Sequence, residues 1–394
     1  MIERKWLFVC AAFASGEAVA SLVPNFAEAW PVCAIVTFLL ALWGLVFKLP
    51  FLRFLCIFVI GMGVYLFSEV EKERVFREKP WMRQVYAKNN KSDVKSRPWA
   101  AQVRRELSRR MGIGLEHSPE TANMNRAILL GERFRMRSDV KRDFVESGTV
   151  HIFAISGLHI GVIAQVFIIL TVFAAVPLRY RALVALPPLW GYVWMLGFPP
   201  SAVRAALMAS IHLSAPIFYR RANMVVEWAI AFMIMHICSP RLIADVGCQL
   251  SFVVMLSIVL SARQVRKLPK LQQRLVVAFC AWAAGVPIVA HTFGTLTPGG
   301  LIANLALVPA AVLAVVAGVL GIILSWVAEP LCAYANNFAA LVTSVMSGFS
   351  SLVAKIPGAN FVVGTWGAVE CVIWYFVLLA IPLGLRIFVA RRLF

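Results

Sequence analysis

The sequence predicts an all-α, polytopic integral membrane protein, because the chain is strongly apolar and its apolar residues lie in long runs. Of its 394 residues, 61% are hydrophobic, and the mean hydropathy is +0.80. An ordinary soluble domain has roughly 45–50% apolar residues. A helix that crosses the hydrocarbon core needs about 20 mostly apolar residues, because its backbone N–H and C=O groups must all bond within the segment.

The apolar runs predict about 10–12 membrane-spanning helices. They lie at residues 6–23, 30–48, 51–69, 150–176, 182–197, 201–218, 223–238, 242–261, 275–293, 301–327, 331–353 and 367–388. Several runs contain proline or glycine, so broken or re-entrant helices are expected among them. The first three runs make residues 1–70 a set of N-terminal transmembrane helices.

Residues 71–142 interrupt the apolar runs and carry much of the positive charge. They hold 19 Lys and Arg against 9 Asp and Glu, and the whole chain holds 38 and 19. Proline, glycine and asparagine punctuate this stretch, which allows short helices such as 99–111 and shows no alternating strand pattern. We therefore expect a basic soluble or amphipathic segment over residues 71–126.

Short basic loops indicate which side of the membrane is cytoplasmic, since Lys and Arg favour that side. When the twelve runs are threaded in order, most short basic loops fall on one side, so both termini are predicted to be cytoplasmic and residues 71–142 external. An external cationic surface is typical of a protein that meets a polyanion, and a basic collar on anionic lipid headgroups is the alternative. The predicted external basic patch consists of Arg104, Arg105, Arg109 and Arg110.

Cysteine usage predicts neither a disulfide framework nor a metal site. All eight cysteines lie inside apolar runs, without a Cys-x-x-Cys spacing or a neighbouring histidine at ligand spacing. They are interpreted as small buried hydrophobic residues. We expect no metal and no cofactor.

A few polar residues lie within the apolar runs. An ionisable group at membrane depth costs several kcal/mol, so it usually faces a cavity or a partner helix and is a functional candidate. His212 and His236 are interpreted as packing histidines. The candidates with a functional interpretation are His151, Ser156, His159, Arg204, Asp245, Gln249, His291 and Asn304.

The stretch HIFAISGLHIG at residues 151–161 combines several of these features. Ser156 and His159 are three residues apart, so they lie on one helical face. Gly157 and Gly161 form a Gly-x-x-x-Gly step that lets a second helix approach closely. This helix is therefore expected to pack tightly or to break locally while presenting polar groups.

Arg204 follows two prolines by one helical turn and admits two interpretations. A fixed guanidinium at this depth binds an anion, or it pairs with Asp245 as a structural bridge between helices. Asp245 and Gln249 are four residues apart and share a helical face.

Four stretches between residues 127 and 310 resemble, in the same order, motifs of ComEC-type competence proteins. The first, AILLGERFRMRSDVKRDFVESGTVHIFAISGLHIG, resembles the opening of the competence domain. The later three are PPSAVRAALMA, DVGCQLSFVVMLSI and VPIVAHTFGTLTPGGLIANLALVP. The resemblance covers most of the chain from residue 127, so residues 127–394 are identified as the competence, or channel, domain.

This resemblance implies that single-stranded DNA crosses the bacterial inner membrane during natural transformation, with the eight polar candidates lining or framing the DNA pathway. It also implies an external DNA receptor as a partner. Inward movement of each phosphate opposes the membrane potential by about 2.3 kcal/mol per 100 mV. Because the chain has no G-x-x-x-x-G-K-[ST] loop, we expect a separate cytoplasmic ATP-dependent translocase.

The sequence indicates that the chain lacks two domains found in many relatives. Its soluble segment is too short and strand-poor for an OB-like domain, and no H-x-H-x-D-H metal motif of a metallo-β-lactamase-type domain is present. We therefore expect that the chain is not an enzyme and that any nuclease is another protein.

Two other functions stay open at the level of sequence. The first is a transporter of a smaller anionic or lipid-linked species, with Arg204 as the binding cation. The second is an intramembrane hydrolase with Ser156 as nucleophile, His159 or His151 as base and Asp245 as the orienting carboxylate.

Overall fold

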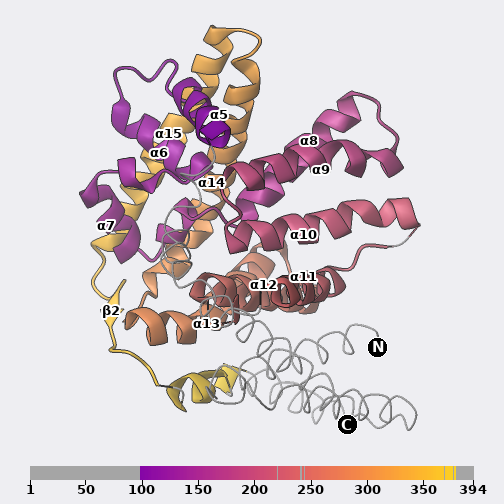
Figure 1. Ribbon diagram of the computed structural model, residues 1–394. Coiled ribbons are helices and arrows are strands. Elements are labelled where there is room, and N and C mark those ends of the chain that lie inside the picture. The colour runs from indigo at the N-terminus through magenta and orange to yellow at the C-terminus, as the bar shows by residue number, and fades with distance from the viewer. Residues whose placement is uncertain are drawn as a thin grey trace, which may run out of the picture. The chain divides into compact units, whose positions relative to one another are not determined.

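The fold class is confirmed as all-α. A computed structural model describes residues 98–219, 221–239, 242–243, 245–367, 369–375 and 377–378. Within these residues helices make up nearly all the regular structure, and the strands are two residues long (Figure 1). The helices predicted within residues 1–70 lie outside the described residues.

The chain divides into two compact units, which are not sequential domains. The first contains residues up to Gln102 together with Leu170–Gln249, and the second contains Val103–Ile169 together with Leu250–Phe394. Three helices have residues in both units. They are α5 (Pro98–Arg110), α8 (Gly157–Phe173) and α12 (Val246–Gln264).

In the first unit α10 (Pro200–Ser214) packs against α9 (Leu178–Met195) and α11 (Met224–Cys238). Proline suits the first position of α10, because the N–H that it lacks would have no partner within the helix. A short 3-10 helix, η4 (Ala215–Phe218), extends α10. Asn223 caps α11, since its Oδ1 accepts a hydrogen bond from the Val225 N–H over 3.1 Å.

The centre of the second unit is the hairpin of α14 (Gly299–Leu324) and α15 (Glu329–Ala354). α6 (Pro119–Leu130) and α7 (Ser138–Glu146) pack on α15, and α6 also contacts α14 (Figure 1). α13 (Lys270–Phe293) also packs against α14.

Short elements connect these helices. They are the 3-10 helices η2 (Arg133–Arg135) and η3 (Val150–Phe153) and the antiparallel strands β1 (Thr295–Leu296) and β2 (Phe361–Val362). α5 confirms the predicted helix 99–111 to within one residue at each end. The predicted domain boundary after residue 126 falls inside α6.

The described part of the chain contains five helical segments that are long and apolar enough to cross a membrane. They are Pro200–Phe218, Val246–Gln264, Lys270–Phe293, Gly299–Leu324 and Glu329–Ala354. α8 and α11 are apolar and shorter. All of these helices overlap predicted apolar runs, so the protein is a multi-pass membrane protein. The total of 10–12 spans stays a prediction.

α15 has two different faces. Its buried face, against α6, α7 and α14, consists of Cys332, Asn336, Ala339, Ala340, Thr343, Met346, Ser350 and Val353. Its exposed face carries a stripe of large apolar residues at intervals of three or four up to Val345 and then, after two turns, at Leu352, as expected for one side of a helix. The stripe extends about 30 Å from Leu331 to Leu352, which matches the thickness of the hydrocarbon core.

The described part of the predicted external segment, residues 98–142, packs together with the residues that follow it against α15, through α6 and α7. Asn336 Nδ2 donates to Arg110 O over 2.9 Å, and the hydroxyl oxygens of Ser147 and Ser350 are 2.8 Å apart. Arg110 also donates to Ser325 O and Oγ, over 3.1 and 2.8 Å, at the α14–α15 turn. The predicted threading places Arg110 outside and this turn in the cytoplasm. Because the two groups touch, these placements cannot both hold.

Candidate functional site

The eight predicted pathway residues are divided between the two units. The second unit contains His151, Ser156, His159, His291 and Asn304, and the first contains Arg204, Asp245 and Gln249. Each group is described within its own unit.

Ser156 and His159 form one half of a capping box at the start of α8, in which the His159 ring bonds the Ser156 N–H. The backbone N–H of Ser156 donates to His159 Nδ1 over 3.3 Å, and Ser156 Oγ lies 3.1 Å from the same nitrogen. In a capping box the side chain at the third helical position reaches back to the N–H of the capping residue. Because Nδ1 accepts this bond, a neutral imidazole carries its proton on Nε2.

This geometry also brings a serine hydroxyl within hydrogen-bond distance of an imidazole, as a nucleophile–base pair requires. His159 Nε2 is buried and has no hydrogen-bond partner among the described residues, so no carboxylate orients the ring. Asp245 belongs to the other unit. The part of the chain that the structure describes contains no complete catalytic triad and no group of three His, Cys, Asp or Glu that could hold a metal ion.

A close backbone approach joins the loop before η3 to the start of α14. Gly148 has φ +73°, and a Cβ there would lie 2.7 Å from Thr297 Oγ1 and 3.2 Å from Gly300 Cα. Only glycine fits both the left-handed conformation and this contact. Beside it, Ser147 Oγ bonds both Thr149 Oγ1 and Ser350 Oγ, at 2.7 and 2.8 Å, with all three residues fully buried.

Two pathway candidates of the second unit have a buried polar atom without a hydrogen-bond partner among the described residues. These atoms are Nε2 of His159, a residue that is 1% exposed, and Oδ1 of Asn304. Leaving a buried donor or acceptor unpaired costs about 1–3 kcal/mol. Such atoms are suited to bond water or a polar substrate. His151, which is exposed, interacts electrostatically with His159.

Gly157 is the first residue of α8, and Gly161 lies one turn later. Gly161 is exposed, and a Cβ there would meet no heavy atom within 4 Å. No other helix of the described residues approaches Gly161 this closely, and the close approach predicted from the Gly-x-x-x-Gly step stays a prediction.

The three candidates of the first unit occupy different environments. Arg204 is 5% exposed within α10, and its Nη1 lies 3.8 Å from Met208 Sδ one turn later. Asp245 is exposed and caps α12, since its Oδ1 accepts from the Cys248 N–H over 2.7 Å. Among the described residues no ion pair joins Arg204 to Asp245. Gln249 Nε2 donates to Ile243 O over 2.7 Å.

His291 lies at the end of α13 and anchors a distant segment. Its Nδ1 is 2.6 Å from Trp366 O, and the Trp366 N–H donates to Ala290 O over 3.3 Å. His291 is exposed. In this structure its visible role is to hold residues 361–366 against the end of the helix.

The four arginines of the predicted basic patch divide into two pairs. Arg104 and Arg110 are largely buried, with side chains 19% and 14% exposed, whereas Arg105 and Arg109 are exposed. Arg104 donates to Leu130 O over 2.8 Å and lies 3.3 Å from a carboxylate oxygen of Glu132. Fewer exposed positive charges therefore lie on α5 than the sequence predicts.

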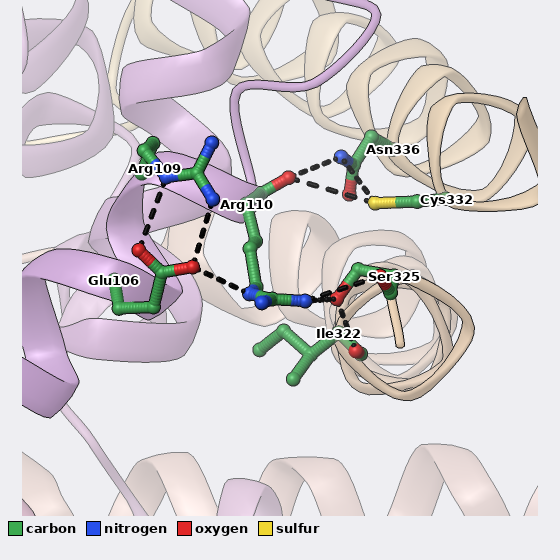
Figure 2. Close-up of polar contacts among 7 residues, drawn as sticks. All are labelled: Glu106, Arg109, Arg110, Ile322, Ser325, Cys332 and Asn336. Atoms are coloured by element: carbon green, nitrogen blue, oxygen red, sulfur yellow. Dashed lines mark hydrogen bonds and ion pairs between the residues drawn. The ribbon is translucent and has the colours of Figure 1, made fainter. Parts of the chain in front are cut away.

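Figure 2 shows how Arg110 joins α5 to the hairpin. Its Nε donates to Glu106 over 2.8 Å, while Nη1 reaches Ser325 at the end of α14. Its guanidinium also lies 3.9 Å from the centre of the Trp326 ring. Glu106 in turn receives two bonds from Arg109, and the two arginines lower the pKa of this carboxyl to about 2, Arg109 more than Arg110.

A family model described as "Competence protein" matches residues 128–387. The chain belongs to the competence protein family. ComE operon protein 3 of Bacillus subtilis (strain 168) is 27% identical over 194 residues, which are 48% of this chain and 25% of that relative. An uncharacterized protein of Aquifex aeolicus (strain VF5) is 25% identical over 250 residues, 62% of this chain and 59% of the relative. No solved structure matches the chain.

The matched part of this competence protein covers about a quarter of the length of the Bacillus subtilis relative. It covers about three fifths of the length of the Aquifex aeolicus relative. Its family motifs coincide with structural features described above. The stretch AISGLHIG contains the capping box of α8, and DVGCQLSF begins with the carboxylate that caps α12.

One buried acidic residue of this competence protein was missed at the level of sequence. Glu227, within the apolar run of α11, is 4% exposed, and its Oε1 lies 3.0 Å from Nδ1 of His212 on α10. A single acidic residue in the run MVVEWAIAFMIMHIC is itself a signal, because an ionisable group within a membrane helix is a functional candidate by default.

Proposed function

We propose that this competence protein passes single-stranded DNA across the bacterial inner membrane into the cytoplasm during natural transformation. The observation that carries the proposal is the family match over residues 128–387, which includes the four ordered motifs. The proposal treats the chain as a channel component and not as an enzyme, with both termini in the cytoplasm.

The buried polar groups support a pathway for a polyanion. His159 and Asn304 each have a polar atom available for bonding, and Arg204 places a guanidinium inside an apolar helix. Single strands are bound through phosphate contacts and base stacking without a strict sequence code. The proposed DNA pathway consists of His151, Ser156, His159, Arg204, Asp245, Gln249, His291 and Asn304.

Partners are part of the same proposal. An external DNA receptor would deliver the strand, and a cytoplasmic ATP-dependent translocase would pull it against the membrane potential. Degradation of the second strand, where it occurs, would fall to a separate nuclease.

The test measures entry of labelled DNA into the cytoplasm of a strain that lacks only this protein. We expect the protected cytoplasmic label to disappear and to return when the gene is supplied on a plasmid. Introduction of DNA by electroporation is the control, since it bypasses the channel and should be unchanged. Normal entry of label without the protein would refute the proposal.

A second function is favoured by one specific observation. The 3.1 Å distance between Ser156 Oγ and His159 Nδ1 fits a nucleophile–base pair of an intramembrane hydrolase. A transporter of a smaller anionic or lipid-linked species, bound by Arg204, is the remaining alternative. Normal DNA entry in the deletion strain would favour the hydrolase or the transporter.

A further inference from the structure

A cavity of about 380 Å³ lies between the end of α5, the turn of residues 111–118 and the start of α6. Its wall includes Arg109, Arg126, Glu116, Ile113 and Leu115, all from the second unit. This volume lies within the range of about 300–1,000 Å³ that is typical of small-ligand sites.

Arg126 presents an unused donor to this cavity. Its Nε donates to Ser108 O over 2.9 Å and its Nη1 to Asn123 Oδ1 over 3.0 Å. Its Nη2 has no acceptor in the described chain and lies against Gly112, where a Cβ would be only 2.5 Å away. Burial lowers the pKa of Arg126, and the charge of Arg135 lowers it further. A half-buried guanidinium without a carboxylate partner favours an anion.

Arg109 brings a second cation to the wall. Two of its nitrogens bond Glu106, and its side chain is 64% exposed. Glu116 also lines the cavity, but the Gly114 N–H donates to its Oε1 over 3.0 Å, so part of its charge is already satisfied. Glu106 offsets the charge of Arg109, so Arg126 contributes the positive charge of the wall that no carboxylate of the described chain bonds.

The cavity lies beside the first turns of α15, where the apolar stripe of that helix begins. A Cβ on Gly114 would lie 2.6 Å from Ala333 Cβ, and Asn337 Nδ2 donates to Gly114 O over 3.2 Å, so the turn rests on the first turns of α15. The apolar stripe of α15 begins at Leu331. Exposed aromatic side chains surround this level, with Trp326 at 72% and Tyr334 at 76%. Exposed Trp and Tyr are typical of the headgroup region of a membrane.

We propose that this cavity binds the phosphate group of an anionic phospholipid. The phosphate would bond Arg126 Nη2 and Arg109, and the first atoms of the lipid would contact Ile113 and Leu115. The apolar walls and the headgroup level favour a lipid over a nucleic acid, whose bases and sugars are polar and do not end in an apolar chain. The site does not depend on the proposed transport of DNA.

The test measures phosphatidylglycerol binding to the purified full chain in detergent by native mass spectrometry, with phosphatidylcholine as the zwitterionic comparison. We expect Arg109→Gln and Arg126→Gln each to weaken phosphatidylglycerol binding about tenfold, as expected for loss of a charge-assisted bond. Arg126→Lys keeps the charge and should be intermediate. Arg105→Gln is the matched control, because Arg105 is exposed on the same helix and does not line the cavity.

Two outcomes would overturn this proposal. The first is equal phosphatidylglycerol binding by the Arg109→Gln and Arg105→Gln variants. The second is loss of single-stranded DNA binding in the cavity variants with lipid binding intact, which would make the cavity a nucleic-acid site. Should Arg126→Gln lower the yield of folded protein, Arg109→Gln decides the matter alone, since its side chain is 64% exposed and bonds only Glu106 of its own helix among the described residues.

Discussion

His159 uses its two ring nitrogens in different ways, and this separates a structural role from a functional one. Nδ1 serves the backbone of Ser156, whereas Nε2 is buried and has no partner in the described chain. Glutamine is the usual alternative to glutamate at this position of a capping box. A glutamine at residue 159 therefore preserves the helix start and removes the ring nitrogen.

We expect Ser156→Ala to lower the free energy of unfolding by about 0.5–1.5 kcal/mol through loss of the hydrogen bond between its hydroxyl and His159 Nδ1, and to retain most DNA uptake. His159→Gln should keep normal abundance and reduce uptake. Transformation frequency and protein abundance in membranes provide the two measurements. A Ser156→Ala variant of normal abundance but without any activity would instead favour the hydrolase interpretation.

Substitutions of Arg204 distinguish a structural role from a functional one within the first unit. If its guanidinium contacts phosphate, Arg204→Ala should abolish uptake at normal abundance, and Arg204→Lys, which keeps the charge but not the bidentate fork, should be partly active. Asp245 caps α12 and forms no ion pair with Arg204 among the described residues, so loss of a bridge between these two side chains would not explain such a result. Collapse of abundance in Arg204→Ala would show a structural role.

Sequence predicted what depends on local pattern and missed what depends on distant contacts. The shared face of Ser156 and His159 followed from their spacing, but the capping box required knowing that α8 begins at Gly157. The bond between Arg110 and Ser325 joins residues 215 positions apart, so no local pattern predicts it. Glu227 was overlooked because one charge barely changes the hydropathy of its run.

At the scale of elements, the docking of α5 onto α15 depends on one buried amide. Asn336 is 1% exposed, and its Nδ2 donates to the backbone oxygens of Arg110 and Ile113 over 2.9 and 3.0 Å. Arg110 is the last residue of α5 and Ile113 lies in the turn that follows it, a region where carbonyls lack helical partners. The amide therefore completes the end of one helix from the side of another.

We expect Asn336→Leu to destabilise the protein by about 1–3 kcal/mol, because Ile113 O would lose its donor, whereas Arg110 O keeps the Ile113 N–H at 3.2 Å. Thermal unfolding of the purified protein and protease cleavage between α5 and α6 measure the effect. Asn337→Leu is the matched control, because Asn337 is exposed and bonds a single carbonyl of the turn, Gly114 O. Equal behaviour of the two variants would contradict the proposed role of Asn336.

The same docking should depend on pH through Glu106. Its pKa falls from 4.5 to about 2, first because of Arg109 and then because of Arg110. A lowered pKa in the folded state stabilises the fold above pH 4.5, and this contribution is lost as the pH falls towards 2. We expect the wild type to lose more thermal stability than Glu106→Gln over this window, with Glu146→Gln as the control, since that carboxylate is similarly exposed but lies 3.8 Å from its arginine. Parallel pH profiles would contradict this expectation.

At the scale of the whole molecule, the contact of α5 with the hairpin constrains the topology. If α14 and α15 both cross the membrane, their turn lies on one side and Lys355, after α15, on the other. Arg109 is close to the turn because Arg110 bonds Ser325. The sequence threading put residues 71–142 on the side opposite to this turn, so one experiment separates the two topologies.

The experiment places single cysteines at Arg109, Val327 and Lys355 in a background without the native cysteines. All three positions are exposed. We expect a membrane-impermeant thiol reagent to label positions 109 and 327 from the same side and position 355 from the other, because a helix of 26 residues is long enough to cross the hydrocarbon core. Labelling of 109 and 355 from one side, with 327 on the other, would restore the external basic segment. It would also remove the hairpin contact on which the lipid site rests.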